Sequence, residues 1–524
     1  MAKFSKILHI FVALTFLFGI LGTTATPPFH LQTKVQPQLL VAAQNNPQAS
    51  LPVIVQKLNK GGSLEARVAA FGGKITKELS LINAFAAELP AWAALELARE
   101  VNVRWVSLDA EVAHSSGPID TTQLVSAFVK TVGADQVWNT APGYLQGQGV
   151  TVAVVDSGNC QNGSTIDKTC NDLYGTNNQM RVLATVSFLG GQSSTEAPDH
   201  YGHGSLVEGI IGGSGRGSNG MYMGISHNVN LVNVRIADNL GMARSSDVVA
   251  GLEWVLENKD TYNIRVVNIS LNSSTPESYH TNPMAAACEI LWFNGIVVVV
   301  SAGNNGSAGL YPPANDPFVI TVGATNDFGT PDLADDVLAS YSAFGSDELG
   351  GNKPDLVAPG TNLVSIVPRV KNKIWKDHSS NRLEDYNSTE YYMRVSGTSF
   401  SAPVVSGAVA LLLQDEPTLT PDQVKYRLMS TANRTWPGYS VTTAGAGYLD
   451  VYAAVNGTST EAANTGFLPS NLLSTGSDPI TWGSVGWNSV GWNSVGWNSV
   501  GWNSVGWNSV GWNSVGWNSD YWGP

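Results

Sequence analysis

The amino-acid sequence has few charged residues and few cysteines for its length. Asp, Glu, Lys and Arg make up 13% of the 524 residues, and three residues are cysteine. The low charge, together with 43% apolar residues and 54 glycines, excludes a disordered chain or a coiled coil and favours a compact fold. No Cys-x-x-Cys pair occurs, so a cysteine-based zinc site is not expected.

Basic residues are in the minority. Residues 116–524 hold 34 acidic and 18 basic residues, which gives this part of the chain a net charge of −16. An acidic body of this kind is repelled by phosphate backbones and by anionic lipid, so nucleic acid is not an expected partner.

Long apolar runs are missing except at the N-terminus. Two lysines precede an apolar run over residues 7–21, and small residues follow in GTTATPP. This pattern is typical of a secretory signal, so we expect cleavage after Ala25 and a secreted, extracellular or cell-surface protein. A lipid-anchored or uncleaved leader is the alternative. The runs near 296–303 and 404–413 are too short to cross a membrane and indicate buried core.

The cysteines suit an exported protein. Cys160 and Cys170 lie ten residues apart in the polar segment SGNCQNGSTIDKTCND, and export favours a disulfide between them. Cys288 lies in the apolar helical pattern MAAACEILWF, which favours a buried small hydrophobic residue over a reactive thiol.

The composition divides the chain into four parts, the first being the signal peptide, residues 1–25. Residues 26–116 contain a linker rich in Pro, Gln and Asn up to about residue 50 and then a small α/β unit. In residues 117–458, strand-like runs such as GVTVAVVDSG and GIVVVVSAGN alternate with helical ones, which predicts a mostly parallel sheet covered by helices on both faces. Residues 459–524 are a linker and a repeat tail.

The tail repeats SVGWN with period five, and its seven VGWN units carry tryptophans from Trp487 to Trp517. Period five matches neither a helix face nor a strand face, and Gly, Asn and Ser favour turns. Tryptophan offers flat apolar faces for sugars, other aromatic rings or an interface. Three interpretations remain open: a spacer, a cell-wall or glycan-binding tail, and a self-assembling segment.

One serine lies at the start of a long apolar run. In VSGTSFSAPVVSGAVALLL, residues 395–413, small residues and a proline precede a segment too apolar for a surface helix. The pattern predicts a turn that presents Ser399 at the positive N-terminal end of a buried helix. That position suits a nucleophile, and it also suits an ordinary helix cap.

Three more polar residues fall at predicted strand ends or helix starts. Asp156 follows a strand in VAVVDSG, His203 opens a helix in YGHGSLVEGIIGG, and Asn304 follows a strand in IVVVVSAGNNG. Ligands of an open parallel sheet bind at the carboxyl ends of its strands. A hydroxyl nucleophile needs a base, the base needs an orienting acid, and an amide N–H₂ group suits an oxyanion.

These four stretches, in the order Asp, His, Ser, resemble the subtilisin-like serine proteases over about residues 148–450. The resemblance implies the subtilisin-like three-layer α/β fold and a secreted endopeptidase that works through an acyl-enzyme without a catalytic cofactor. It assigns Asp156 as the orienting acid, His203 as the general base and Ser399 as the nucleophile. Asn304 and the Ser399 backbone N–H become the oxyanion donors.

Residues 51–115 resemble the ferredoxin-like propeptides of the same family, which assist folding and block the active site until they are cleaved. The resemblance implies a self-processing zymogen with its own propeptide as an intramolecular inhibitor. We expect the prosegment to end near residues 114–117, in AEVAHSSGP.

Two stretches resemble the family's substrate cleft. NISLNS, residues 268–273, resembles the strand that lines the main specificity pocket and supplies Ser270, Leu271 and Asn272. LGMAR, with Gly241, resembles the edge strand that pairs with the substrate backbone. The family often has glycines at Asn272 and the next residue, so we expect a narrower or more polar pocket. No pocket acid is evident, which favours broad cleavage of protein or peptide substrates.

Five positions depart from the family pattern, and none of them removes a catalytic group: Ser205, Leu206, Glu208, Phe400 and Ser401. The carboxylate of Glu208 falls in a helix that we expect to be buried, where it must be paired or protonated.

The segment around His203 also has a possible interpretation as a metal site. Asp199, His200 and His203 form DHYGH, but its glycine disfavours a helical zinc site and no metal ligand is assigned. Structural calcium is common in subtilisins, and the loop 159–178 is rich in Asp and Asn.

Two other functions are alternatives to the endopeptidase. One is an inactive subtilase-like surface or adhesive protein that acts through its Trp-rich tail, and the other is a serine esterase. The intact set of four residues and the propeptide favour the protease, and a peptide-binding edge strand favours peptides over esters.

Overall fold

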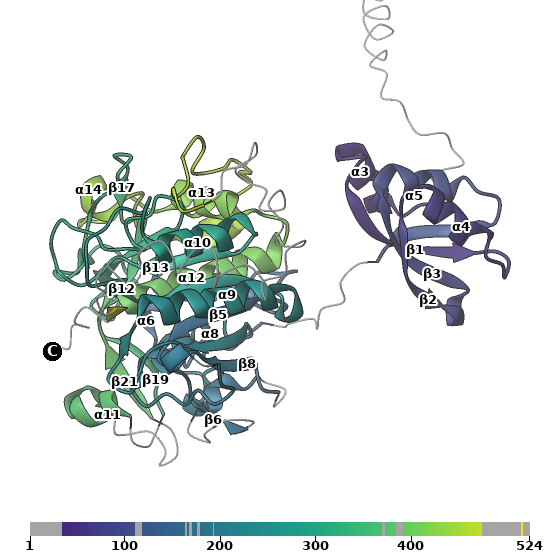
Figure 1. Cartoon of the computed structure of the whole chain (residues 1–524). Helices are drawn as coiled ribbons and strands as arrows, with labels where there is room; N and C mark the ends of the chain where they lie inside the picture. The colour runs from purple at the N-terminus through teal and green to yellow at the C-terminus, as the bar shows by residue number, and fades with distance from the viewer. Residues whose placement is uncertain are drawn as a thin grey trace, which may run out of the picture. The chain divides into compact units, whose positions relative to one another are not determined.

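The computed structural model describes residues 34–109, 118–162, 165–166, 170–175, 179–191, 193–368, 372–383, 391–473 and 515–516. The chain forms two compact units, residues 1–114 and 115–524, each described by itself below (Figure 1). The predicted signal peptide, the expected end of the prosegment and most of the repeat tail lie outside the described residues.

The first unit is a four-stranded antiparallel sheet with helices in its connections. Its strands lie in the order β2-β3-β1-β4, with every neighbouring pair antiparallel. Along the chain the elements are β1 (Ser50–Lys57), α4 (Ser63–Ala70), β2 (Lys74–Leu79), the 3-10 turn η1 (Ser80–Ile82), β3 (Ala84–Pro90), α5 (Ala91–Ala98) and β4 (Val103–Leu108). This βαββαβ order is the ferredoxin-like α/β arrangement that the sequence predicts for the unit.

Part of the segment that the sequence predicts as a linker is helical. Helix α3 (Pro37–Asn45) begins with proline at its first position, where the missing N–H is tolerated. Leu39 and Ala43 are buried and α3 packs against α5, so the prediction of a linker up to residue 50 is wrong for this helix.

The second unit is built on a mostly parallel sheet, as predicted. Its strands, in spatial order, are β8 (Val182–Ser187), β9 (Asn230–Arg235), β5 (Thr151–Asp156), β11 (Ile264–Ile269), β13 (Val297–Ser301), β14 (Ile320–Asn326) and β18 (Leu356–Pro359). These seven strands are mutually parallel, and β15 (Val337–Leu338) adds to β14 in the antiparallel direction. Runs of valine and isoleucine fit such strands because β-branched side chains pack well on a pleated surface.

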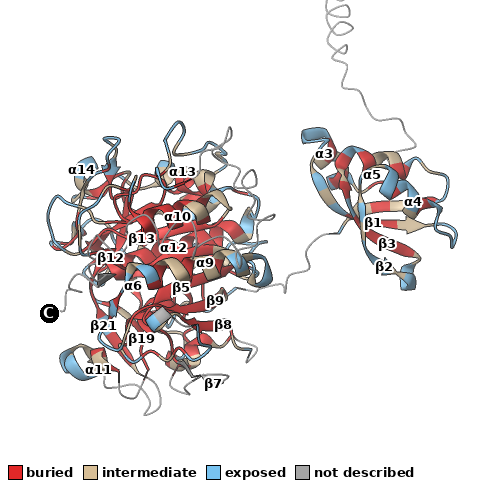
Figure 2. Cartoon of the chain, viewed as in Figure 1, coloured by how far each residue is buried: buried red, intermediate tan, exposed pale blue. Residues whose placement is uncertain are grey.

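Helices cover both faces of this sheet. Every residue of β5 and of β13 is buried, and side chains of a strand alternate between its two faces, so both faces must be covered (Figure 2). Helix α8 (His203–Gly212) packs against α12 (Thr398–Asp415), and α9 (Ser245–Tyr262) packs against α10 (Pro283–Phe293). The predicted subtilisin-like three-layer α/β fold is therefore confirmed.

Shorter elements complete the second unit. The helices are α6 (Ala127–Thr131), α7 (Ala134–Asn139), α11 (Lys373–Asp377), α13 (Pro421–Thr431), α14 (Val441–Ala444) and α15 (Val451–Asn456). The strands are β6 (Gln161–Asn162), β7 (Thr165–Ile166), β10 (Met242–Ala243), β12 (Asn272–Ser273), β16 (Gly345–Ser346), β17 (Asn352–Lys353), β19 (Leu363–Ile366), β20 (Arg382–Leu383), β21 (Tyr392–Val395) and β22 (Val515–Gly516). In the part of the chain that the structure describes, no helix has the length and apolar character needed to span a bilayer.

The chain beyond α15 continues to pack on the second unit. The Ser470 N–H donates to Glu289 Oε2 at 2.7 Å, and the Asn471 N–H donates to the His280 carbonyl at 2.9 Å. Residues 459–473, which the sequence assigns to a linker, thus pack on the second unit.

The cysteines behave as the sequence predicts. Cys160 and Cys170 form a disulfide, with their α carbons 6.1 Å apart. Cys288 is buried in α10, and burial raises the pKa of its thiol. A thiol in such surroundings is part of the core.

A buried ion cluster joins β14, β17 and α13 through Asp355, which lies just before β18. Asp355 Oδ2 accepts hydrogen bonds from Lys353 Nζ and from the Thr321 N–H, each at 2.7 Å. Its Oδ1 lies 3.1 Å from Lys425 Nζ, and all three charged side chains are at most 5% exposed. The two ammonium groups hold the pKa of Asp355 below its usual value although burial alone would raise it.

We predict that Asp355→Ala lowers the free energy of unfolding by about 3–5 kcal/mol, because it leaves two buried ammonium groups without a counter-ion. Urea unfolding in a Ser399→Ala background, which prevents self-digestion, measures this change. The control is Asp377→Ala, which breaks an exposed ion pair with Lys373 and should leave the midpoint unchanged. Equal midpoints for both variants would contradict the prediction.

Candidate active site

Asp156 and His203 meet at the carboxyl edge of the sheet. Asp156 is the last residue of β5, and His203 is the first residue of α8. His203 Nδ1 lies 2.9 Å from Asp156 Oδ1 and 3.0 Å from Oδ2, and both side chains are fully buried. Burial raises the pKa of Asp156, while the imidazole and the Ser157 N–H, which donates to Oδ1 at 2.6 Å, oppose that shift.

Two glycines allow this pair to form. A β carbon at Gly204 would lie 2.1 Å from the Gly158 carbonyl oxygen and 3.1 Å from Asp156 Oδ1. Gly158 itself has φ +118°, and a β carbon there would lie 2.7 Å from the Ala197 carbonyl oxygen. The glycines beside Asp156 and His203 therefore let two backbone segments approach more closely than other residues permit.

Asp199 organises the start of α8. Its Oδ1 accepts from the Gly202 N–H at 2.6 Å and from Ser157 Oγ at 2.8 Å. Its Oδ2 accepts from the N–H and the hydroxyl of Ser205, at 2.9 and 2.8 Å. Ser157 Oγ in turn accepts from the Gly204 N–H at 3.0 Å, so one carboxylate holds both sides of the Asp156–His203 contact.

The metal interpretation of DHYGH finds no support in this arrangement. Both oxygens of Asp199 bind protein donors, and Nδ1 of His203 faces Asp156. Within the described ranges, no group of three or more His, Cys, Asp or Glu side chains is placed to hold a metal ion. Sequence reasoning named Asp199 only as a candidate ligand and missed its structural role.

Ser399 lies in the first turn of α12. The helix begins at Thr398, and its N-cap is Gly397, with φ 150° and ψ 155°. Ser399 is therefore the second residue of the helix, and the alternative that it caps the helix is wrong. The rings of His203 and Phe400 have centroids 5.0 Å apart, so the residue beside Ser399 contacts the histidine.

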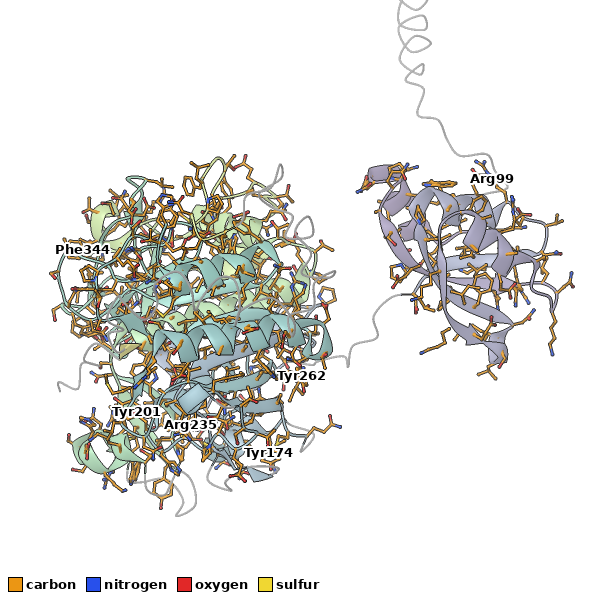
Figure 3. All side chains as sticks on the ribbon, viewed as in Figure 1. Arg99, Tyr174, Tyr201, Arg235, Tyr262 and Phe344 are labelled. Carbon is orange, nitrogen blue, oxygen red and sulfur yellow. A yellow bond between two sulfur atoms is a disulfide. The ribbon has the colours of Figure 1, made fainter. Side chains whose placement is uncertain are left out.

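Two aromatic rings lie near the imidazole of His203. Tyr201, labelled in Figure 3, stacks on His203 with ring centroids 6.4 Å apart. Phe400 and His203 are both fully buried, so the two rings meet inside the protein.

A chain of hydrogen bonds ties the Ser399 turn to the sheet. Ser270 Oγ donates to the Ser399 carbonyl at 2.7 Å, and Asn268 Nδ2 donates to Ser270 Oγ at 2.8 Å. Ser406 Oγ donates to Asn268 Oδ1 at 2.9 Å. Sequence reasoning missed Asn268 and Ser406; polar residues inside an otherwise buried strand and helix were the available signal.

Asn304 is held against the same turn. Its Oδ1 accepts from the Thr398 N–H at 2.8 Å and from Thr398 Oγ1 at 2.9 Å, and Thr398 Oγ1 accepts from the Gly303 N–H at 3.0 Å. The amide oxygen of Asn304 thus binds Thr398, and Nδ2 is the atom of this side chain that can donate a hydrogen bond to a substrate. The role of Thr398 in holding Asn304 was not predicted from the sequence.

The residues expected to bind substrate lie at the beginning of two short strands or just before them. Gly241, with φ +82°, turns the chain into β10, and Leu271, which is buried, precedes β12. Asn272 Nδ2 donates to the Ser301 carbonyl at 2.9 Å, so its side chain is tied to the end of β13. The expected narrowing of the pocket by Asn272 stays a prediction.

The departures from the family pattern have local partners. Both carboxyl oxygens of Glu208 accept from Asn159 Nδ2, each at 3.2 Å, and burial raises the pKa of Glu208 well above its usual value. Ser205 binds Asp199, and Leu206 is fully buried. The acid that had no partner in the sequence therefore lies against an asparagine from the loop that follows Asp156.

In the described part of the loop 159–178, the carboxylate of Asp172 is bound by protein donors. Asp172 accepts from the Gly217 N–H at 2.7 Å and from the Tyr392 hydroxyl at 2.8 Å, one donor to each oxygen. Structural calcium stays a prediction, because much of this loop lies outside the described residues.

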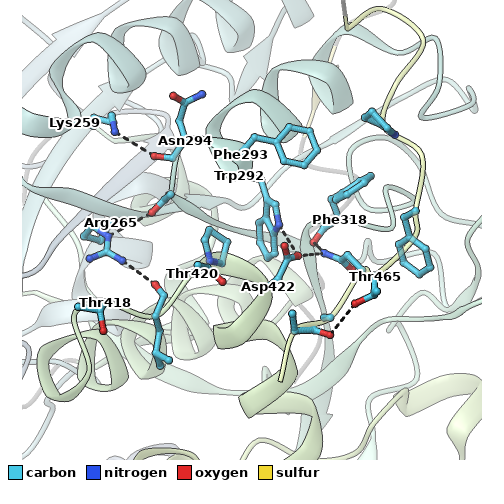
Figure 4. A pocket seen from close by; sticks show the side chains of 18 of the residues that line it. Lys259, Arg265, Trp292, Phe293, Asn294, Phe318, Thr418, Thr420, Asp422 and Thr465 are labelled. Atoms are coloured by element: carbon cyan, nitrogen blue, oxygen red, sulfur yellow. Dashed lines mark hydrogen bonds between the residues drawn. The ribbon is translucent and has the colours of Figure 1, made fainter. Parts of the chain in front are cut away.

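A pocket of about 670 Å³ lies elsewhere in the second unit (Figure 4). Its lining includes Asn263 and Arg265 at the beginning of β11 and Gly295 just before β13. It therefore opens at the edge of the sheet opposite to Asp156 and Asn304. Asp422 braces it by accepting hydrogen bonds from Trp292 Nε1 and Asn464 Nδ2, at 3.0 and 2.8 Å.

Comparisons with known proteins agree with this geometry. The model of the subtilase family matches residues 147–464. Serine protease AprX of Bacillus subtilis (strain 168) is 33% identical over 393 residues, which cover 73% of this chain and 81% of that protein. Subtilisin E of the same strain is 31% identical over 390 residues, with 73% and 83% covered.

A solved structure shares the fold. The crystal structure of fervidolysin from Fervidobacterium pennivorans, described as a keratinolytic enzyme related to subtilisin, matches with a TM-score of 0.50 and 23% sequence identity. The match covers 78% of this chain and 61% of fervidolysin, and at this identity it bears on the fold alone.

We predict that Gly204→Ala lowers kcat/KM for a peptide substrate at least about 10²-fold, since the new methyl group forces Asp156 and His203 apart and small misplacements of catalytic groups are costly. The control is Gly345→Ala, where the nearest atoms lie 3.6 Å away. Circular dichroism establishes that both variants fold. Full activity of a folded Gly204→Ala protein would show that the close approach is not needed.

Glu208 gives a second prediction, on pH. Because burial raises its pKa, the folded protein keeps a proton that the unfolded chain loses above about pH 4.3. The free energy of unfolding therefore falls as the pH rises from there toward the folded-state pKa. In Glu208→Gln this loss disappears, so the variant should gain stability over its parent between pH 5 and pH 8.

Urea unfolding at several pH values in a Ser399→Ala background measures this difference. Glu196→Gln, at an exposed position, is the matched control. The prediction fails if Glu208→Gln and its parent lose stability with pH in parallel.

Proposed function

The chain belongs to the subtilase family of serine proteases, and from this premise we propose that it is an endopeptidase that is secreted as a self-processing zymogen. The observation that carries the proposal is the buried Asp156–His203 pair beside the helix turn that holds Ser399. The four residues that the family's chemistry needs are all present in the order that the family uses.

The proposed reaction passes through an acyl-enzyme. His203 takes the proton of Ser399 Oγ as that oxygen attacks the carbonyl carbon of the scissile peptide bond. Asp156 holds the imidazole in the required tautomer and stabilises its positive charge. The oxyanion accepts hydrogen bonds from Asn304 Nδ2 and the Ser399 N–H. His203 then protonates the leaving amine as the C–N bond breaks, and a water molecule releases the acyl group by the same steps.

A peptide is the substrate class that the cleft supports best. Strands β10 and β12 offer extended backbone on which a substrate can be bound as an added strand. An esterase has no need of such a strand site. The proposed specificity is broad, since the predicted pocket stretch NISLNS contains no acid that would select lysine or arginine.

The first unit supports the zymogen proposal. Its sheet and helices enclose a core of their own, in which Val53, Phe85 and Leu97 are fully buried. A unit that folds around its own core can remain intact after a cut in the connection to the second unit. We propose that residues 26–116 act as the intramolecular inhibitor and that the cut falls near residues 114–117.

The alternative of an inactive surface or adhesive protein would call for the loss of at least one catalytic group, and the chain retains all four. Secretion and a cell-wall or glycan ligand for the tail remain predictions from sequence.

We predict that the purified parent chain shortens to an N-terminus near residues 114–118, whereas Ser399→Ala keeps its full prosegment. Intact mass and N-terminal sequencing measure both products. The control is Ser401→Ala, which introduces the residue that the family usually has and should be processed like the parent. Processing of purified Ser399→Ala at the parent's rate would refute self-cleavage by this serine.

A further inference from the structure

A piece of the repeat tail lies in the cleft. Strand β22 (Val515–Gly516) lies between β10 and β12 and pairs antiparallel with both (Figure 1). Gly516 lies opposite Met242 and Asn272, and Val515 lies opposite Ala243 and Ser273. Val515 begins the seventh VGWN unit of the sequence.

Strands β10 and β12, the two walls of the cleft, each direct backbone N–H and C=O groups toward β22. The Met242 N–H donates to Asp238 Oδ1 at 2.9 Å, and its carbonyl accepts from the Asp238 N–H at 2.8 Å. The Ser273 N–H donates to the Pro312 carbonyl at 2.7 Å. Neighbouring residues of an extended strand direct their N–H and C=O groups to opposite sides, so Ala243 and Asn272 direct theirs toward β22.

The register relates this strand to the nucleophile. Ser270, whose hydroxyl binds the Ser399 carbonyl, lies two residues before Asn272. Because the pairing is antiparallel, the tail runs toward Ser270 as its residue numbers rise. The position two residues after the one opposite Asn272 therefore lies opposite Ser270. A ligand of sequence Val-Gly-Trp-Asn held in this register would bring its asparagine to the Ser399 turn.

We propose that the VGWN repeat is a ligand of the protein's own substrate cleft, bound as an added strand that competes with substrates. This inference rests on the proposed function, because it takes the gap between β10 and β12 to be the place where a substrate backbone binds. The tail is thereby a second internal competitor, distinct from the N-terminal prosegment.

The chemistry of the repeat suits this role. Valine favours an extended backbone, and glycine keeps the backbone N–H that pairs with Asn272. Residues 481–519 carry no charge, so the net charge of −16 on residues 116–524 does not repel them. Because the tail has seven such units, seven segments of the same sequence can bind the cleft.

Because the tail is part of the same chain, a repeat unit can occupy the cleft even when it binds weakly. A segment joined by a flexible linker has an effective concentration on the order of millimolar, so a unit with a dissociation constant near 1 mM occupies the cleft about half of the time. Binding of that strength closes the cleft to dilute substrates and yields to abundant ones. Competition of this kind raises KM and leaves kcat unchanged.

The first test removes one backbone donor from every unit of the full chain. Proline replaces glycine at Gly486, Gly491, Gly496, Gly501, Gly506, Gly511 and Gly516 in one variant, and alanine replaces the same seven in the control. Proline has no N–H to pair with Asn272, whereas alanine keeps it. The readout is KM and kcat for a short chromogenic peptide.

We expect the proline variant to have a KM lower than that of the parent by a factor of about 2–10, with equal kcat, for the effective concentration above. The alanine variant should match the parent. If the parent, the proline variant and the alanine variant all have the same KM, the inference is overturned. Hydrolysis of the peptide by these proteins would still support the proposed function.

The second test needs no activity. In a full-length Ser399→Ala chain, Met242→Cys is combined with Gly516→Cys, whose α carbons should lie about 4.5 Å apart as a non-hydrogen-bonded pair. We expect a disulfide under mild oxidation, identified as a linked peptide by mass spectrometry. Leu240→Cys with Gly516→Cys is the control, since Leu240 is exposed nearby and has no partner position in β22.

A folded protein that forms no 242–516 link, or that links position 240 equally well, overturns the inference. If the Ser399→Ala protein forms the specific link but the parent chain hydrolyses no peptide, the proposed function is refuted and the inference stands.

Discussion

The close approach of two glycine backbones determines the geometry of the whole site. The first turn of α8 reaches the end of β5 only because Gly204 has no β carbon, which would lie 2.1 Å from the Gly158 carbonyl oxygen. This contact brings His203 within 2.9 Å of Asp156 inside the protein, where no water competes for the carboxylate. Asp199 then secures both segments from one side.

The parallel sheet explains why residues so far apart in sequence gather here. Its strands all end at one edge, so the residues after β5, β11 and β13 meet there without long excursions of the chain. Helix α12 completes the arrangement. Its first turn is fixed by Ser270 from one strand end and by Asn304 from another, both through direct hydrogen bonds. A buried polar group is costly unless it is paired, and the pairs used here also orient the chemistry.

Local patterns in the sequence were enough to predict the fold and to select the candidate residues of the site. A strand followed by Asp156, a glycine-flanked His203 and a small-residue turn at Ser399 each carry their signal within a few residues. The disulfide and the buried Cys288 were also predictable, since composition and hydrophobic pattern report on both.

Residues that act through distant partners were not predictable in the same way. Asp199 and Asn268 owe their roles to groups that only the folded chain brings near, so nothing in their neighbours distinguishes them from ordinary polar residues. The same holds for Glu208, whose partner Asn159 lies 49 residues earlier. The strand that the tail adds to the cleft has no local signal either, because period five predicts neither helix nor strand.

The account stands on Ser399 being activated by His203, and a fluorophosphonate probe tests this directly. An activated serine oxygen displaces fluoride from phosphorus and keeps the phosphonyl group, which peptide mass spectrometry then locates. The account predicts one label, on Ser399, in the parent and none in His203→Ala. A label on another serine, or equal labelling of Ser399 in both proteins, would contradict it.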